Sequence, residues 1–230
     1  MQTTPKPLNK RLTISSKPRL KTERTQTAIL SAAENHFSRL GFAATRLEDI
    51  ADELGLTRAA LFYHFKDKQT LFDAMIVNAF SSFAQTLKSV LQSEDHSISK
   101  RLELAAAAWV DVVVSRPNLS RLLLRFVADG MEHPLQKIFI ENELTPQSFF
   151  ELVEKGRRTG ELSPLHDDPT HIACVIIGAP LFYAAAIASL VPNSQFEPLD
   201  PVQVAVHKRQ TLWLQRGLLG INPREDESVP

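Results

Sequence analysis

The sequence predicts an all-α fold of about nine helices, divided into a small N-terminal three-helix unit and a larger C-terminal helical unit. All strong apolar periodicity follows the helical pattern, and strand-like alternation with glycine-rich hairpin signals is missing. The length of 230 residues suits one small domain followed by a larger one. We expect a disordered basic arm over residues 1–21, the three-helix unit over 22–72, the helical body over 73–220 and a frayed tail over 221–230.

Two short helices joined by a tight turn are predicted between residues 45 and 71. The first has one apolar face, formed by Leu47, Ile50, Ala51 and Leu54. Thr45 is expected to cap this helix, with Glu48 completing a capping box, and Gly55 suits the left-handed position that ends it. Thr57 is expected to cap the second helix. This arrangement is a helix-turn-helix, the unit whose second helix enters the DNA major groove.

The helix-turn-helix resembles the DNA-binding segment of TetR-type repressors over about residues 25–72. The matching residues are Phe37, Gly41, Phe42, Thr45, Ile50, Ala51, Leu54, Gly55, Thr57, Leu61, Tyr63, His64, Phe65, Lys68 and Leu71. The rest of the chain resembles the family only in its general pattern. The resemblance implies a homodimeric repressor that binds a palindromic operator in double-stranded DNA and is released by a small, largely apolar effector. One departure is Phe62, where the family usually has Tyr.

The helix-turn-helix supplies the candidate DNA contacts. Phosphate contacts are expected at Thr57, Tyr63 and Lys68 and, at helix N-termini, at Thr25, Thr45 and Arg46. Base contacts are expected at Arg58, Ala59, Ala60 and Phe62, on the outward face where the second helix begins. Among these, the Arg58 fork matches guanine O6 and N7. His64 is expected to bind phosphate or cap the helix end. For each residue alone, the alternative is an ordinary exposed helix surface.

The charge distribution favours the same end of the chain. The formal net charge is zero, but residues 1–72 hold 12 Lys and Arg against 7 Asp and Glu, a net of +5. Phosphate binding requires local positive charge rather than a positive total. The basic segment 1–24 is either a solvated tail or an arm that touches DNA.

The remaining helices are expected at about residues 67–93, 97–116, 118–128, 134–159 with a break near 145, 169–191 and 201–219. If the family pattern holds, the body encloses a ligand chamber. Its candidate lining residues are Phe83, Trp109, Arg121, Arg125, Phe126, Phe149, Phe150 and Tyr183. Most of these aromatic residues are also suited to an ordinary core, and the two arginines to surface pairs with acidic residues. No metal or cofactor is expected, although His166, Asp167, Asp168 and His171 lie close in sequence.

The run from Ile172 to Val191 has no charged residue over 20 positions, which is long enough to cross a membrane. We interpret it instead as a buried helix that pairs with residues 201–219 to form the dimer interface, with no membrane contact. Cys174, the single cysteine, is expected to be a small core residue rather than a nucleophile. One cysteine excludes disulfides within the chain and indicates a cytoplasmic protein.

The sequence thus predicts a ligand-responsive transcriptional repressor. The first alternative is a DNA-binding regulator or architectural factor without a small-molecule ligand, controlled by a protein partner. The second is an enzyme with an incidental helix-turn-helix, which no nucleophile elbow, phosphate loop or zinc pattern supports.

Overall fold

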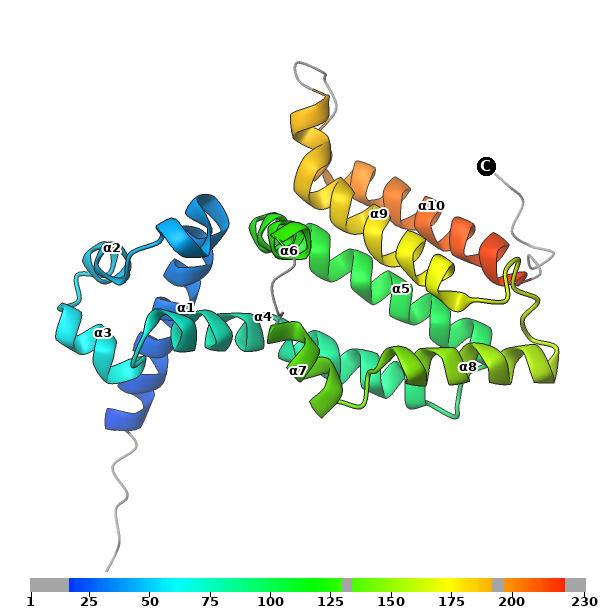
Figure 1. The fold of residues 1–230 in the computed structure, drawn as a ribbon, viewed down its shortest axis with the longest axis horizontal. Helices are drawn as coiled ribbons and strands as arrows, with labels where there is room; N and C mark the ends of the chain where they lie inside the picture. The colour runs from blue at the N-terminus through cyan, green and yellow to red at the C-terminus, as the bar shows by residue number, and fades with distance from the viewer. Residues whose placement is uncertain (1–16, 130–133, 192–196, 222–230) are drawn as a thin grey trace, which may run out of the picture.

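The computed structural model describes residues 17–129, 134–191 and 197–221, and every regular element within these ranges is a helix (Figure 1). Ten helices are present there, one more than expected. The predicted break near residue 145 separates α7 (Pro134–Glu141) from α8 (Pro146–Thr159). The break separates two distinct helices, because α8 has its own N-cap: the Thr145 hydroxyl accepts a hydrogen bond from the Ser148 N–H at 3.2 Å.

Three helices gather at one end of the molecule: α1 (Lys17–Ala44), α2 (Leu47–Glu53) and α3 (Arg58–His64) (Figure 1). Helix α1 starts at Lys17, so residues 17–21, which were expected to belong to the arm, are helical. The rest of the arm, 1–16, and tail residues 222–230 lie outside the described residues. Gly41 adopts φ +81° and ψ 168°, which is outside the helical region, so the regular helix is interrupted at this glycine and α1 continues to Ala44 only after a kink.

Helix α4 (Lys68–Gln92) joins this end to the body. Its buried face carries Leu71, Phe72, Met75, Ile76, Ala79, Phe80 and Phe83. Near its start, Phe72 packs edge-on against Phe37 and Phe42 of α1, with ring centroids 5.1 and 5.3 Å away. Further along, Phe83 lies 5.6 Å from Trp109 of the body. One apolar core therefore runs from the three-helix end into the body, and each large buried side chain contributes about 1.5–3 kcal/mol.

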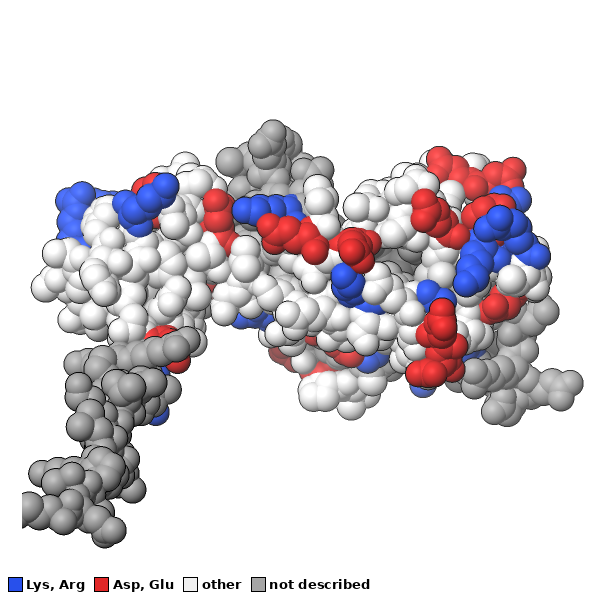
Figure 2. All heavy atoms as spheres, turned by 90° about the horizontal axis from the view of Figure 1, so that it is seen from below, with Lys and Arg blue, Asp and Glu red and all other residues white. Residues whose placement is uncertain are grey.

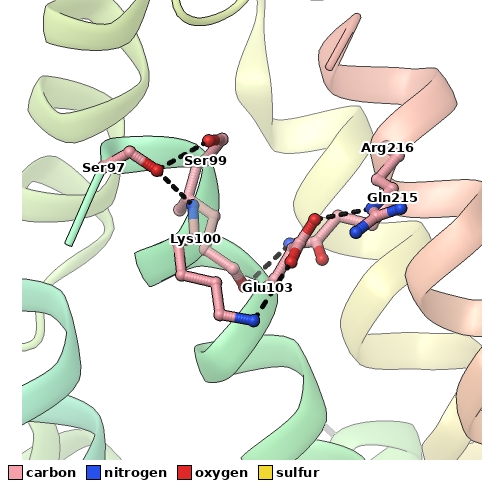
Figure 3. Close-up of polar contacts among 7 residues, drawn as sticks. Ser97, Ser99, Lys100, Glu103, Gln215 and Arg216 are labelled. Carbon is pink, nitrogen blue, oxygen red and sulfur yellow. Dashed lines mark hydrogen bonds and ion pairs between the residues drawn. The ribbon is translucent and has the colours of Figure 1, made fainter. Parts of the chain in front are cut away.

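The body contains α5 (Ile98–Ser115), α6 (Pro117–Asp129), α9 (Pro169–Leu190) and α10 (Pro201–Leu219), with α7 and α8 packed against α4 and α5 (Figure 1). Helix α10 is held to α5 by polar contacts drawn in Figure 3. Arg216 Nε lies 2.5 Å from Glu103 Oε1, and Gln215 donates to the Leu102 carbonyl at 3.0 Å. Glu103 is buried, so its carboxylate needs this cation.

Helix α9 contains Pro180, which cannot donate a hydrogen bond to the preceding turn. The indole N–H of Trp109 donates to the Ile177 carbonyl, 3.0 Å away, in that turn.

Only one face of α9 is covered. Ile172, Ile176 and Leu181 are buried, whereas Cys174 is exposed, so the expectation of a buried cysteine was wrong. By length and composition, α9 is the one membrane-span candidate among the described residues, with a third of its apolar window buried.

Candidate nucleic-acid interface

The turn between α2 and α3 has the geometry that the sequence predicted. Leu56 donates to the Ala51 carbonyl at 2.9 Å, and Gly55 adopts φ +63°. The Thr57 hydroxyl accepts a hydrogen bond from the Ala60 N–H at 3.1 Å and so caps α3. Buried Leu61 anchors α3 in the core and leaves its outer face exposed.

Thr45 does not cap α2, contrary to expectation. The N-cap is Arg46, which makes no side-chain cap bond, so the predicted capping box is absent. The Thr45 hydroxyl instead donates to the Gly41 carbonyl at 2.8 Å, and its side chain is only 2 % exposed. A threonine hydroxyl commonly donates in this way to the carbonyl four residues earlier, which takes it away from the capping role. A buried Thr45 side chain cannot reach DNA, so we withdraw it from the candidate contacts.

Arg58 is the most constrained of the exposed α3 residues. Its Nη1 lies 3.1 Å from Glu48 Oε1 of α2, and its guanidinium carbon lies 5.3 Å from the centre of the Phe62 ring. The Arg58 side chain is 68 % exposed. The carboxylate and the ring together restrict a long side chain that would otherwise be freely mobile, and the partly buried Phe62 is fixed by the core.

The other candidates on this surface differ in exposure. Arg46, Thr57 and Ala59 are exposed, and Tyr63 is the most exposed at 81 %. The half-buried candidates are Thr25, Ala60, Phe62 and His64. The helix-turn-helix therefore brings most of the predicted contacts onto one end of the chain.

Lys68 has partners that sequence reasoning did not predict. Its Nζ donates to the carbonyls of Phe42, Ala43 and Thr45 at 2.8, 3.0 and 3.0 Å, and it lies 4.8 Å from the centre of the Phe42 ring. Two residues earlier, Lys66 is 81 % exposed, with Asp67 Oδ2 at 4.0 Å.

Three further polar contacts hold the three-helix end in place. His36 Nε2 of α1 lies 2.7 Å from Glu53 Oε2 of α2. Arg116, between α5 and α6, donates to Glu34 Oε2 of α1 at 2.9 Å and to the Ala79 carbonyl of α4 at 3.0 Å. Burial raises the pKa of Glu34, and Arg116 partly opposes that shift. His36 and Glu34 could have been identified from the sequence, because each is a polar residue on an otherwise apolar helix face.

Basic side chains lie at the exposed end of the α1–α3 unit in Figure 2, whereas basic and acidic side chains alternate over the body. The positive excess of residues 1–72 comes from the segment 1–24, which holds seven Lys and Arg and one acidic residue, Glu23. Residues 25–72 alone hold five Lys and Arg against six Asp and Glu, so phosphate binding by the helix-turn-helix would depend on where its basic side chains lie rather than on its net charge.

The predicted ligand-chamber residues lie at several separate places in the body. Phe83 and Trp109 lie in the core, and Tyr183 stacks on His207 with ring centroids 3.8 Å apart while its hydroxyl donates to the Pro198 carbonyl. Phe149 packs beside a second core, and the side chain of Phe126 lies outside the described residues. Arg121 and Arg125 are exposed.

Two hollows in the described part of the chain are open to solvent. One is lined by Phe150 and polar residues of α8; the other lies between α1 and α6, is lined by Arg121 and Arg125, and has a volume of about 260 Å³. Arg121 donates to the Ala185 carbonyl and to Asn118 rather than to an acidic residue. Among the described residues, no group of three potential metal ligands occurs, and the rings of His166 and His171 meet edge-on.

An all-helical fold with an exposed helix-turn-helix at one end defines a DNA-binding regulator, and comparison with known proteins agrees. Residues 29–75 match the model of the tetR family of bacterial regulatory proteins. The transcriptional regulator RutR of Escherichia coli K12 is 27 % identical over 157 residues, which is 68 % of this chain and 72 % of RutR. The nucleoid occlusion factor SlmA of Aliivibrio fischeri is 25 % identical over 162 residues, 69 % of this chain and 80 % of SlmA.

The fold of the whole described chain is also shared. A tetR-family regulatory protein from Rhodococcus RHA1 superposes with a TM-score of 0.64 at 19 % identity, covering 87 % of this chain and 99 % of that one. Residues 29–75 are therefore similar to the DNA-binding segment of tetR-family transcriptional regulators, and the chain has the fold of such a regulator.

Proposed function

We propose that this protein is a repressor that binds a palindromic DNA operator as a homodimer, with α3 of each subunit in the major groove. The observation that carries the proposal is the outer face of α3, where an exposed and restrained Arg58 is followed by small Ala59 and Ala60. Small side chains permit close approach to base edges, and the Arg58 fork matches guanine. Phe62 supports Arg58 from beneath and is suited to apolar contact with thymine.

Phosphate contacts surround this face in the proposal. Thr57 uses its oxygen as an acceptor within α3, which leaves its O–H hydrogen to be donated to a phosphate. Tyr63 projects from the next turn, and the remaining phosphate candidates are Thr25, Arg46 and His64. Such contacts fix the orientation of the protein on DNA without reading sequence directly.

The dimer is proposed to form through α9 and α10. On α9, Ile177, Phe182 and Leu190 are 51, 45 and 61 % exposed, and on α10, Val202 and Trp213 are 66 and 63 % exposed. Apolar surface of this extent on two adjacent helices requires a cover, and a second copy provides the same surface about a two-fold axis. A dimer cover makes a membrane unnecessary, and we propose a cytoplasmic protein with residues 22–72 as its DNA-binding domain and 73–220 as its body.

A small apolar effector is proposed to act on the body. It can shift the balance between two subunit arrangements only through its different affinities for them. Helix α4 would connect the effector site in the body to the helix-turn-helix, since it contacts the core of both halves. The alternative is a DNA-binding regulator or architectural factor without a small-molecule ligand, controlled by a protein partner, and the similarity to the nucleoid occlusion factor SlmA gives it some support.

The proposed function is tested by titrating purified protein against a duplex that it selects from random sequences, with light scattering to count chains per duplex. We expect two chains per palindrome and much weaker binding to unrelated DNA. A screen of small apolar molecules by thermal midpoint, followed by release from the duplex, separates the two forms of control. Unchanged midpoints across the screen would favour the protein-partner alternative.

A further inference from the structure

The ammonium group of Lys68 is fully used inside the protein. An ammonium has three N–H donors, and Lys68 directs hydrogen bonds to three backbone carbonyls, those of Phe42, Ala43 and Thr45. It also lies 4.8 Å from the centre of the Phe42 ring. A phosphate could be bound by this ammonium only if one of these bonds were broken.

The three carbonyls need such a partner because of where they lie. The last carbonyls of a helix have no intrahelical N–H donors, and together they form the negative end of the helix dipole. Phe42 and Ala43 belong to the last turn of α1, beyond the kink at Gly41, and Thr45 precedes the first turn of α2. A cation placed among them compensates both the missing donors and the partial negative charge.

Lys68 is itself the first residue of α4. Its neighbour Asp67 caps the same helix end by accepting a hydrogen bond from the Thr70 N–H at 2.7 Å. The side chain of Lys68 therefore joins the start of α4 to the junction between α1 and α2. A displacement of α4 would carry the entry to the helix-turn-helix with it.

From this geometry we propose that Lys68 is a positioning residue for DNA binding, which fixes the α1–α2 junction against α4, and that the phosphate contact near this helix end is made by exposed Lys66. The proposal rests on the proposed function, since it concerns how the helix-turn-helix is held for DNA. Lys66 is 81 % exposed, and its ion partner Asp67 lies 4.0 Å away, beyond the distance of a hydrogen bond.

Lys68→Met and Lys66→Met form a matched pair. Each substitution removes one positive charge and keeps an apolar side chain, and the two positions are only two residues apart. Two quantities are measured for each: the thermal midpoint without DNA, and the slope of log affinity against log salt on the duplex selected by wild-type protein. For Lys68→Met we expect a lower midpoint, weaker binding and the wild-type slope. For Lys66→Met we expect the wild-type midpoint and a slope shallower by about 0.9 for each phosphate that the variant no longer neutralises.

Lys68→Arg keeps the experiment decisive if Lys68→Met does not fold. A phosphate contact tolerates Arg, whereas the three convergent carbonyls fit a compact ammonium better than a planar fork. We expect Lys68→Arg to have a lower midpoint and a lower affinity than wild-type protein. A Lys68→Met protein with an unchanged midpoint and a shallower slope would overturn the proposal. Failure of wild-type protein to select any sequence would count against the proposed function alone, because the midpoint comparison needs no DNA.

Discussion

Arg116 and Glu34 form an ion pair, 2.9 Å from Nη2 to Oε2, that joins the corner between α5 and α6 to helix α1 of the DNA-binding end. The same guanidinium donates to the Ala79 carbonyl of α4. One side chain of the body thus contacts both helices on which the position of the helix-turn-helix depends. This connection gives the body a direct polar link to α1 in addition to the continuous apolar core.

Arg116→Ala should lower the free energy of unfolding by roughly 1–3 kcal/mol, because it leaves the half-buried Glu34 carboxylate without its partner. Urea unfolding measures the change. Lys137→Ala is the control, since the Lys137 ammonium makes an exposed contact with Glu141 at 3.9 Å. Equal stability of the Arg116 and Lys137 variants would show that the ion pair contributes nothing.

Glu34→Gln should cost less than Arg116→Ala. Burial opposes ionisation of Glu34, as its raised pKa shows, so an uncharged amide that still accepts the Arg116 hydrogen bond removes a burial penalty. The same urea series tests this order. A larger destabilisation by Glu34→Gln would mean that the charge attraction dominates.

Arg58→Ala should relax the preference at one base pair of each half-site, at a cost of about 1–3 kcal/mol per contact. Affinities for the operator and for single-position variants of it give the measurement. Arg46→Ala serves as the comparison, because a phosphate contact should weaken binding to all sequences alike. A uniform decrease in affinity for Arg58→Ala would assign it to a phosphate.

Burial lowers the pKa of His207, which stacks on Tyr183. The unfolded imidazole then takes up a proton at a pH where the folded one stays neutral, so the free energy of unfolding should fall as pH drops through about 6.5. His207→Gln should remove this part of the pH dependence, and Tyr183→Ala should shrink it by exposing the ring. The measurement is the difference between the urea unfolding midpoints at about pH 7.5 and about pH 5.5, compared between wild-type protein and the two variants. An unchanged difference in both variants would contradict the account.

Phe182→Glu should separate the dimer, because it would bury an unpaired carboxylate at each side of the proposed interface. Light scattering measures the mass. Ile140→Glu on α7 is the matched control, since Ile140 is also an exposed large apolar residue, at 62 %. Ala184 is unsuitable for this test because it lies in the monomer core, at 6 % exposure. A Phe182→Glu protein that remains a folded dimer would place the interface elsewhere.

The sequence predicted the elements that local chemistry determines. Thr57 caps α3, Gly55 takes the left-handed position, and the break near Pro146 divides two helices, because each depends on residues within one turn. Thr45 was mispredicted because its hydroxyl donates to the Gly41 carbonyl, four residues earlier in the chain, instead of capping α2.

Contacts between segments that are distant in the sequence could not be predicted from local sequence patterns. The partners of Lys68, and the link from Arg116 to Glu34, depend on how α1, α4 and the α5–α6 corner pack together. Cys174 was expected in the core because periodicity does not identify the covered side of a helix that is apolar all round. The same ambiguity applies to the aromatic residues, because local patterns do not distinguish a buried core position, as at Phe83 and Trp109, from a position that lines a chamber.

The most direct test of the central claim is to sequence the DNA that purified protein selects from a random-sequence library. A homodimer that presents two α3 helices should recover inverted repeats whose half-site centres lie about 10–10.5 base pairs, or a multiple of that, apart. A guanine within each half-site should lose its preference when Arg58→Ala replaces wild-type protein in the same selection. Recovery of no recurrent sequence, or of single sites without an inverted partner, would contradict the account.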